Sequence, residues 1–377
     1  MHTHARDPRA SRPPAGVPAV SMASKRVTRS GEPPPTGRAK GNPFMSGAWE
    51  PVRAEHTNMD LTVTRGAIPP GLEGTFVRTG PNPRFPERHD QRRYHFFAGD
   101  AMVHGVELKD GKAHYRNRWV QTRGLRRDLA TMGESVGQPP PPSFGKGSSG
   151  GNTAMLYHGG RLLALSEGTQ GAWQLALPSL DTVGFFTFGD ELKHNFTAHP
   201  KVCAETEELH FFGYGDNEVD PQNDRAAHIH YSAVSSTGKL QFKDVPIPFR
   251  RPIMAHDMAL TRKHAIFFDM PLWSMTKPVS NDDTTRFGVI ARGASSDAVQ
   301  WFEAKGCYGY HTANAWDVVV AEANGDEDEE EHSCIELIYC ASERIHFQRS
   351  NADSLFLQCA FLELEMSRYH QSVVLLD

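Results

Sequence analysis

The chain lacks several features that would assign it at once to a common class of proteins. It has only five cysteines and no Cys-x-x-Cys pair, which fits a reducing compartment better than a disulfide framework. No run approaches the roughly 18 apolar residues of a transmembrane helix. Neither charge prevails, since 40 Lys and Arg oppose 45 Asp and Glu, and the net charge of −5 does not favour nucleic-acid binding. These absences predict a soluble protein of 377 residues, long enough to bury a core.

Turn residues are abundant, with 26 prolines and 33 glycines spread along the chain, which favours many short elements. Lys109-Asp110-Gly111-Lys112 is a hairpin signal between two apolar runs. Short runs recur about every 8–12 residues and predict an all-β sandwich, barrel or propeller. The expected strands are Gly74–Arg78, Tyr94–Phe97, Met102–Leu108, Ala113–Val120, Ala154–Tyr157, Arg161–Leu165, Thr182–Phe188, Leu209–Tyr214, Ile229–Val234, Ala265–Asp269, Phe287–Ala291 and Ala298–Phe302.

The first 45 residues differ from the rest of the chain. They hold eight Lys and Arg but only Asp7 and Glu32 as acids, and they have few large apolar residues. Such a segment does not bury enough surface to fold. We expect a transit peptide or a disordered tail at residues 1–45, or a gene-model artefact, followed by one domain over residues 46–377. A transit peptide would indicate a plastid; otherwise the cytoplasm is expected.

Histidine is unusually common, with 19 residues, and three of these histidines share a local pattern. His199 (FTAHPK), His256 (PIMAHDM) and His311 (CYGYHTAN) each end an aromatic or apolar stretch at a turn, ahead of a hydrophobic strand. They are 57 and 55 residues apart. In a radially repeated fold, equal spacing brings equivalent positions to one axis, where imidazoles bind Zn, Cu, Fe or Ni. Three separate, hydrogen-bonded histidines are the alternative that spacing alone leaves open.

At these histidines the sequence resembles the carotenoid cleavage dioxygenase family. The resemblance extends from about residue 42 to Asp317 and consists of ordered motifs. These are IPPGL (68–72), GTFVRTGPNP (74–83), YHFFAGDAMVHG (94–105), GNTAMLY (151–157), LALSEG (163–168), the three histidine segments and RFGVIAR (286–292).

The resemblance implies a seven-bladed β-propeller with an Fe(II) ion on its axis, held by four histidines. Three of these ligands correspond to His199, His256 and His311. Glu167 matches a glutamate that lies behind the histidines and accepts a ring N–H, which fixes the tautomer; an ordinary strand-end carboxylate is the alternative. The implied reaction is oxygenase cleavage of a conjugated C=C bond. O₂ and a lipophilic polyene, a carotenoid or apocarotenoid, would give two carbonyl products.

The C-terminal region departs from the family pattern. The fourth ligand of the family lies in a late motif, yet only 66 residues follow His311 and none resembles that motif. His332, His346 and His370 lack the right context. The sequence therefore predicts a propeller that is incomplete at its C-terminus. A catalytically inactive relative, or a gene-model fragment, is the alternative function.

A second departure lies between Arg123 and Gly151, where relatives carry longer apolar helices that dock on a membrane. Here we expect one short helix over Leu125–Met132 and a flexible Pro/Gly/Ser-rich loop. Only Leu125, Leu129 and Met132 offer an apolar face, so membrane docking is expected to be weak or absent. The short polar loop slightly favours a smaller substrate, such as a stilbene-type alkene.

Overall fold

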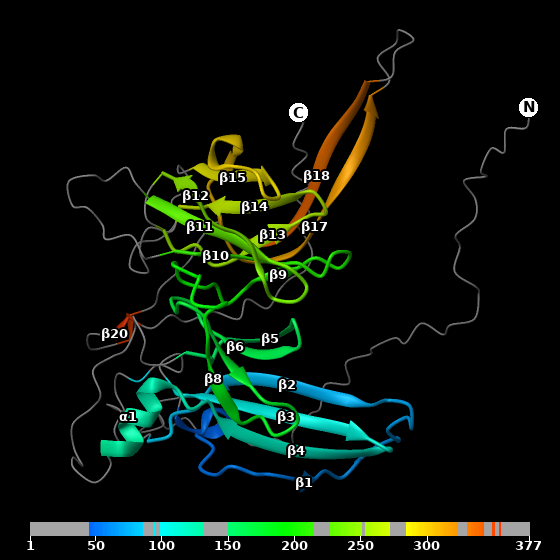
Figure 1. Ribbon diagram of the computed structural model, residues 1–377, viewed down its shortest axis with the longest axis vertical. Coiled ribbons are helices and arrows are strands. Elements are labelled where there is room, and N and C mark those ends of the chain that lie inside the picture. Colours follow the sequence, from blue (N-terminus) through cyan, green and yellow to red (C-terminus); the bar gives the residue numbers. More distant parts are fainter. Residues whose placement is uncertain are drawn as a thin grey trace, which may run out of the picture. The chain divides into compact units, whose positions relative to one another are not determined.

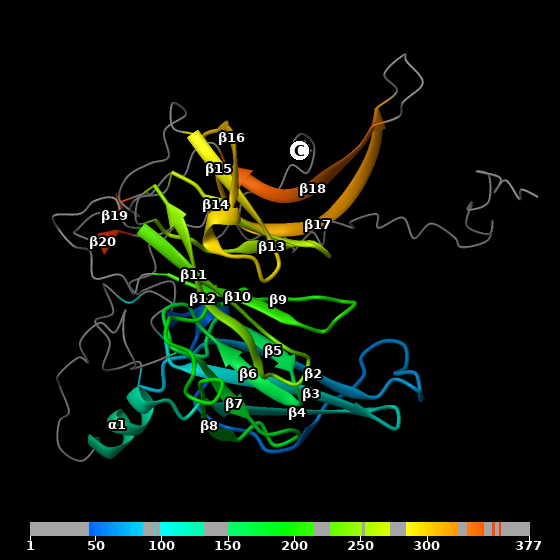
Figure 2. The ribbon, with the colours of Figure 1, turned by 45° about the horizontal axis from the view of Figure 1, so that its top comes forward.

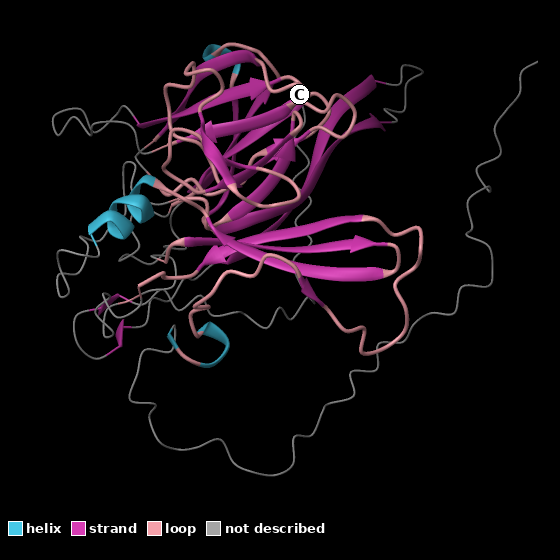
Figure 3. Cartoon of the chain, turned by 60° about the horizontal axis from the view of Figure 1, so that its bottom comes forward, coloured by secondary structure: helices cyan, strands magenta, loops and turns pink. Residues whose placement is uncertain are grey.

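The computed structural model describes residues 45–85, 94, 99–131, 150–214, 227–250, 253–271, 284–322, 330–342, 349–350 and 354–355. Within these ranges the protein is almost entirely β-structure (Figures 1 and 3). The helical elements described are α1 (Arg123–Thr131) and two short 3-10 helices, Gly47–Trp49 and Ser296–Ala298.

Four antiparallel sheets of four strands each follow one another along the chain. The first contains β1 (Met59–Asp60), β2 (Gly74–Pro81), β3 (Ala101–Lys109) and β4 (Lys112–Trp119). The second contains β5 (Ala154–His158), β6 (Arg161–Leu165), β7 (Ala172–Leu175) and β8 (Thr182–Phe186). The third contains β9 (Lys201–Val202), β10 (Leu209–Gly213), β11 (Ala227–Val234) and β12 (Leu240–Phe249). The fourth contains β13 (Met258–Leu260), β14 (His264–Asp269), β15 (Thr284–Ala291) and β16 (Gln300–Lys305).

Two further strand pairs complete the described β-structure. β17 (Tyr308–Glu322) pairs with β18 (Glu330–Ser342), and β19 (Arg349–Ser350) pairs with β20 (Ser354–Leu355). The last three sheets of four have the strand order of a simple meander, in which each strand pairs with its neighbours in sequence. This order is what short turns between consecutive strands produce, because antiparallel neighbours need no long crossover.

Each sheet packs against the next through apolar side chains. Phe211 of the third sheet lies in one buried cluster with Leu163 of the second, and Phe267 of the fourth lies in another with Tyr231 of the third. Tyr308 of β17 shares a cluster with Phe287 of the fourth sheet. A strand that is covered on both faces is therefore apolar along most of its length. In β10, for example, all five residues are buried.

The predicted hairpin at Lys109–Lys112 is confirmed. Lys109 pairs with Lys112, and the two residues between them have φ values of 51° at Asp110 and 69° at Gly111. Positive φ at both central positions is the geometry of a type I′ turn, whose twist matches that of the flanking strands.

Several described strands escaped the sequence prediction: β1, β7, β9, β12, β13, β19 and β20. β12 contains Pro246 and Pro248, which indicate a loop in a sequence read by itself. It lies at the edge of its sheet, where proline does not remove a hydrogen bond from a second neighbouring strand. β9 and β13 have only two and three residues, too few for a recognisable alternation. Of the predicted strand Tyr94–Phe97, all but Tyr94 lies outside the described residues.

The predicted short helix is found as α1, and its apolar residues do not form one exposed face. Leu125 is only 1% exposed and packs with Phe85, Met102 and Trp119, so it belongs to the core. Leu129 is exposed, and Met132 lies outside the described residues, as does the loop over 132–149. No helix in the described parts of the chain has the length and apolar character needed to cross a bilayer.

The predicted fold class, an all-β chain of successive antiparallel sheets, is confirmed. The count of seven blades stays a prediction, because four sheets of four strands lie within the described residues. Residues 1–44 lie outside them, so the boundary expected near residue 45 also stays a prediction.

Candidate metal centre

The three predicted histidines occupy similar places in three successive sheets. His199 lies two residues before β9 and His256 two residues before β13, and both are in extended segments without regular structure. His311 lies in β17. β13 is in contact with both β9 and β17 (Figure 2). The first strands of three successive sheets therefore bring histidines that are 57 and 55 residues apart in sequence to one place.

His311 does not precede its strand as the sequence predicted; it lies within β17. The strand pairing with β18 shifts register between Gly309 and His311 and again between Thr312 and Asn314. Such a bulge leaves one residue unpaired, increases the local twist and redirects the neighbouring side chains. Two irregularities on either side of His311 are the reason why a strand residue can join two histidines that lie in loops.

The imidazoles of His199, His256 and His311 form one group. Each offers a nitrogen atom, and these atoms all lie within 4.8 Å of one another. The Nε2 atoms of His256 and His311 are 3.2 Å apart. Nε2 of His199 is buried and has no hydrogen-bond partner among the described residues. Buried polar atoms are rarely left without a partner.

This donor set fits a transition-metal ion. Imidazole nitrogens bind zinc at about 2.0–2.1 Å, and two such bonds at 90–110° would separate the nitrogen atoms by about 2.8–3.4 Å. The 3.2 Å between His256 and His311 falls in this range. The bare Nε2 of His199 faces the same group, so a bound cation would supply its missing partner.

Glu167 lies beside this group, in the turn that follows β6. Phe196 N–H donates to the carbonyl of Thr169 (2.6 Å), and this isolated bridge ties the Glu167 turn to the segment that carries His199. Oε1 of Glu167 lies 2.5 Å from Nδ1 of His256. The sequence predicted a histidine partner for Glu167, and the structure identifies it as His256.

Tyr214 holds the other oxygen of the same carboxylate. Its hydroxyl donates to Oε2 of Glu167 at 2.6 Å. Because Oε1 lies 2.5 Å from Nδ1 of His256, the ionised carboxylate favours the tautomer with its proton on Nδ1, which leaves the lone pair of Nε2 for the group. Sequence reasoning missed Tyr214, which follows the last residue of β10 and carries no motif of its own.

Burial and mutual proximity lower the pKa of two of the histidines, His199 and His311. Burial, and then the neighbouring His256, lower the pKa of His199 to about 4, and the same two causes lower the pKa of His311. Burial alone would raise the pKa of Glu167, but its hydrogen bonds with His256 and Tyr214 outweigh burial and leave that pKa below its usual value. Neutral imidazoles beside an ionised carboxylate are the protonation states that metal ligation needs.

The other histidines considered as a fourth ligand cannot be placed at the group. His332 lies in β18 opposite Val320, and its side chain is outside the described residues. His346 and His370 lie wholly outside them. The fourth ligand therefore stays a prediction.

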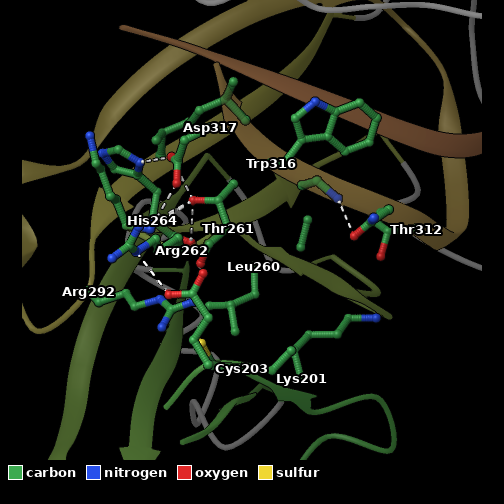
Figure 4. A pocket seen from close by; sticks show the side chains of 18 of the residues that line it. Lys201, Cys203, Leu260, Thr261, Arg262, His264, Arg292, Thr312, Trp316 and Asp317 are labelled. Carbon is green, nitrogen blue, oxygen red and sulfur yellow. Dashed lines mark hydrogen bonds and ion pairs between the residues drawn. The ribbon is translucent and has the colours of Figure 1, made fainter. Parts of the chain in front are cut away.

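A cavity of about 720 Å³ borders the histidine segments (Figure 4). Lys201 and Thr312, which follow His199 and His311 in sequence, contribute to its wall. Its charged residues pair with each other: Nδ1 of His264 lies 2.9 Å from Asp317. Trp316 adds an aromatic face. The lining is therefore mixed, and most of its charges are already compensated.

Comparison with known proteins identifies the family. The model of the family described as retinal pigment epithelial membrane protein matches residues 49–367. The chain belongs to this family, the carotenoid oxygenases. It is 35% identical over 312 residues to carotenoid 9,10(9',10')-cleavage dioxygenase 1 of Pisum sativum, a match that covers 73% of this chain and 55% of the pea protein. The chain thus spans about half the length of this relative.

Solved carotenoid oxygenase structures share the fold. The lignostilbene dioxygenase of Pseudomonas brassicacearum is 28% identical with a TM-score of 0.62, over 78% of this chain and 61% of that one. The apocarotenoid oxygenase of Synechocystis, a Glu150Gln mutant in its own numbering, is 19% identical with a TM-score of 0.59, over 78% and 71%. The resemblance that the sequence motifs predicted is confirmed.

Proposed function

We propose that the protein is an Fe(II)-dependent dioxygenase that cleaves a conjugated C=C bond of a carotenoid or apocarotenoid with O₂ to give two carbonyl products. In this proposal His199, His256 and His311 are metal ligands, and Glu167 orients His256. The observation that carries it is the convergence of three imidazoles, whose nitrogen atoms lie within 4.8 Å of one another, with Nε2 of His199 buried and without a hydrogen-bond partner among the described residues. Membership of the carotenoid oxygenase family supports the same reaction class.

The residues of the chain prepare the site for a cation and a neutral substrate. Glu167, 2.5 Å from Nδ1 of His256, favours a proton on that nitrogen and so leaves the lone pair of Nε2 for a cation, while burial favours the unprotonated form of His199. Bound iron would supply the oxygen chemistry, which protein side chains alone do not perform. Because neutral imidazoles bring no charge, the ion would retain its own positive charge and positions for O₂ and substrate.

Carotenoid and apocarotenoid substrates follow from the name of the pea relative and of the Synechocystis structure. A stilbene-type alkene is the second candidate, because the structural neighbour from Pseudomonas is a lignostilbene dioxygenase at 28% identity. The two classes differ in size and polarity, so product analysis distinguishes them directly.

The test is to load the purified 377-residue chain with Fe(II) under anaerobic conditions, measure bound iron, and then add O₂ with a carotenoid, an apocarotenal or a hydroxystilbene. We expect about one iron per chain and aldehyde or ketone products from one substrate class. His256→Ala should abolish both iron binding and product. Iron-loaded protein that forms no carbonyl product from any of the three substrates would favour the inactive relative over the enzyme.

The compartment is a separate proposal. Residues 1–45 are basic and poor in acids, which supports a plastid address. A fluorescent reporter fused to residues 1–45 should enter plastids; a reporter that stays in the cytoplasm would contradict this.

A further inference from the structure

We propose that Asp257 is a positioning residue for the metal, whose carboxylate holds the three histidine-bearing segments at the spacing that ligation requires. The inference rests on the proposed function, because it assumes that the three imidazoles bind one ion. Asp257 touches none of the three rings through a described hydrogen bond. It acts on the backbone that carries them, which distinguishes it from Glu167.

The first oxygen of this carboxylate connects two of the segments. Asp257 directly follows His256, and its side chain is only 1% exposed. Its Oδ1 accepts the backbone N–H of Met258 at 2.8 Å, which fixes the start of β13. The same oxygen lies 2.8 Å from Nζ of Lys201. Lys201 begins β9, two residues after His199, so this ion pair links the His256 segment to the His199 segment.

The second oxygen reaches the third segment. Oδ2 of Asp257 accepts the backbone N–H of Thr312 at 2.8 Å and its hydroxyl at 3.1 Å. Thr312 directly follows His311 and lies between the two register shifts of β17. A single buried carboxylate thus contacts all three segments, each within two residues of its histidine. Lys201 and Thr312 are labelled in Figure 4 at the border of the cavity.

The hydrogen bonds and the ion pair of the Asp257 carboxylate act together. Hydrogen bonds to an ionised group are roughly twice as strong as neutral ones. Removing one partner of a buried charged set leaves the others unpaired, which costs more than the bond itself. The segments belong to different sheets, so a small shift of one sheet would separate the imidazoles. Asp257 opposes that shift next to the three histidines, where a displacement would change the distances between the imidazole nitrogens most directly.

The test variant is Asp257→Asn in the 377-residue chain. The amide has the shape of the carboxylate, but one of its two ends is a donor. In either orientation that end faces donors, Thr312 on one side or Met258 N–H and the Lys201 ammonium on the other. We expect the affinity for Fe(II), measured by anaerobic competition with a chelator, to fall about 10–100-fold. The visible absorption of the Co(II)-loaded protein should change as well.

The matched control is Asp269→Asn. Asp269 is fully buried and its Oδ2 binds Arg250 (3.0 Å) and Arg286 (2.6 Å), so it too is a paired carboxylate that joins separate strands. It contacts none of the histidine segments through a described bond. Asp269→Asn should lower the melting temperature but leave the Fe(II) affinity and the Co(II) spectrum unchanged. A general loss of packing would affect both variants alike.

Two further variants decide the question if Asp257→Asn does not fold. Lys201→Met removes the ion pair, and Thr312→Val removes the hydroxyl donor but keeps the N–H. Each should weaken Fe(II) binding, Thr312→Val by less. Fe(II) affinities equal to that of the unmodified protein in all folded variants would overturn the role of Asp257. Failure of the unmodified protein to bind Fe(II) would instead overturn the metal site on which the inference rests.

Discussion

The Nε2 atoms of His256 and His311 lie 3.2 Å apart, although 55 residues separate them in sequence. The carboxylate of Glu167, 2.5 Å from Nδ1 of His256, favours the tautomer with its proton on Nδ1. The lone pair of Nε2 then accepts the Nε2–H of His311, or binds a cation once His311 gives up that proton. On the proposed function a metal ion replaces this hydrogen bond, which leads to the first prediction.

Metal should stabilise the fold, because an ion that binds the native state alone adds free energy by mass action. Fe(II) at 100 times its dissociation constant should add about 2.7 kcal/mol to the free energy of unfolding. Anaerobic thermal melts with and without Fe(II) measure the shift. His256→Ala should abolish it, whereas His264→Ala, which alters the His264–Asp317 pair in the cavity, should retain it. Equal shifts in both variants would contradict a site at His256.

Tyr214 should support the metal site through Glu167. Tyr214→Phe removes a 2.6 Å hydrogen bond to Oε2 of an ionised carboxylate and should cost about 1.5–3 kcal/mol of stability. It should also weaken Fe(II) binding, because the carboxylate that holds His256 becomes freer to move. Tyr231→Phe is the control: its buried hydroxyl pairs with Nδ1 of His210 at 2.7 Å, away from the histidine group. Denaturant unfolding and chelator competition on both variants separate the two effects, and equal loss of Fe(II) affinity would refute the role of Tyr214.

His210 should make stability fall in mild acid. Burial, and then the charge of Arg292, lower its pKa to about 4, against the partial compensation by Glu208. As the pH falls, His210 of the unfolded chain therefore binds a proton near pH 6.5, whereas His210 of the folded chain binds one only near pH 4. The contribution of His210 is complete above pH 6.5 and is lost as the pH falls toward 4. Urea unfolding between pH 7.5 and 4.5 should show a shallower decline for His210→Gln; an unchanged slope would contradict this.

Of the two leucines in helix α1, only Leu125 should contribute to stability by packing against the core. Leu125→Ala empties a buried site against Phe85, Met102 and Trp119 and should cost about 2–5 kcal/mol. Leu129→Ala, at a side chain 39% exposed, should change stability by less than about 0.5 kcal/mol. Thermal denaturation of both variants measures this. A larger loss at Leu129 would mean that the helix packs through its other face.

The difference between Leu125 and Leu129 shows where the sequence prediction stopped. The helix itself was predictable from local composition, and its boundaries differ from the expected ones by one or two residues. The face that the helix buries was not predictable, because the two leucines are equally apolar. Leu125 is the buried one because it packs against Met102 of β3 and Trp119 of β4. The same holds for β12, whose prolines are tolerated only because the strand lies at a sheet edge.

The sequence by itself determined the family, the all-β character, and the candidates His199, His256, His311 and Glu167. These features were predictable because local motifs and turn residues indicate them, and such local patterns depend only on residues that are neighbours in sequence. Tertiary structure alone decided the rest. It paired Glu167 with His256, placed Tyr214 behind that pair and moved His311 into a bulged strand. It also put Asp257 between three sheets, because contacts between distant segments depend on how whole sheets pack, and no local pattern records that packing.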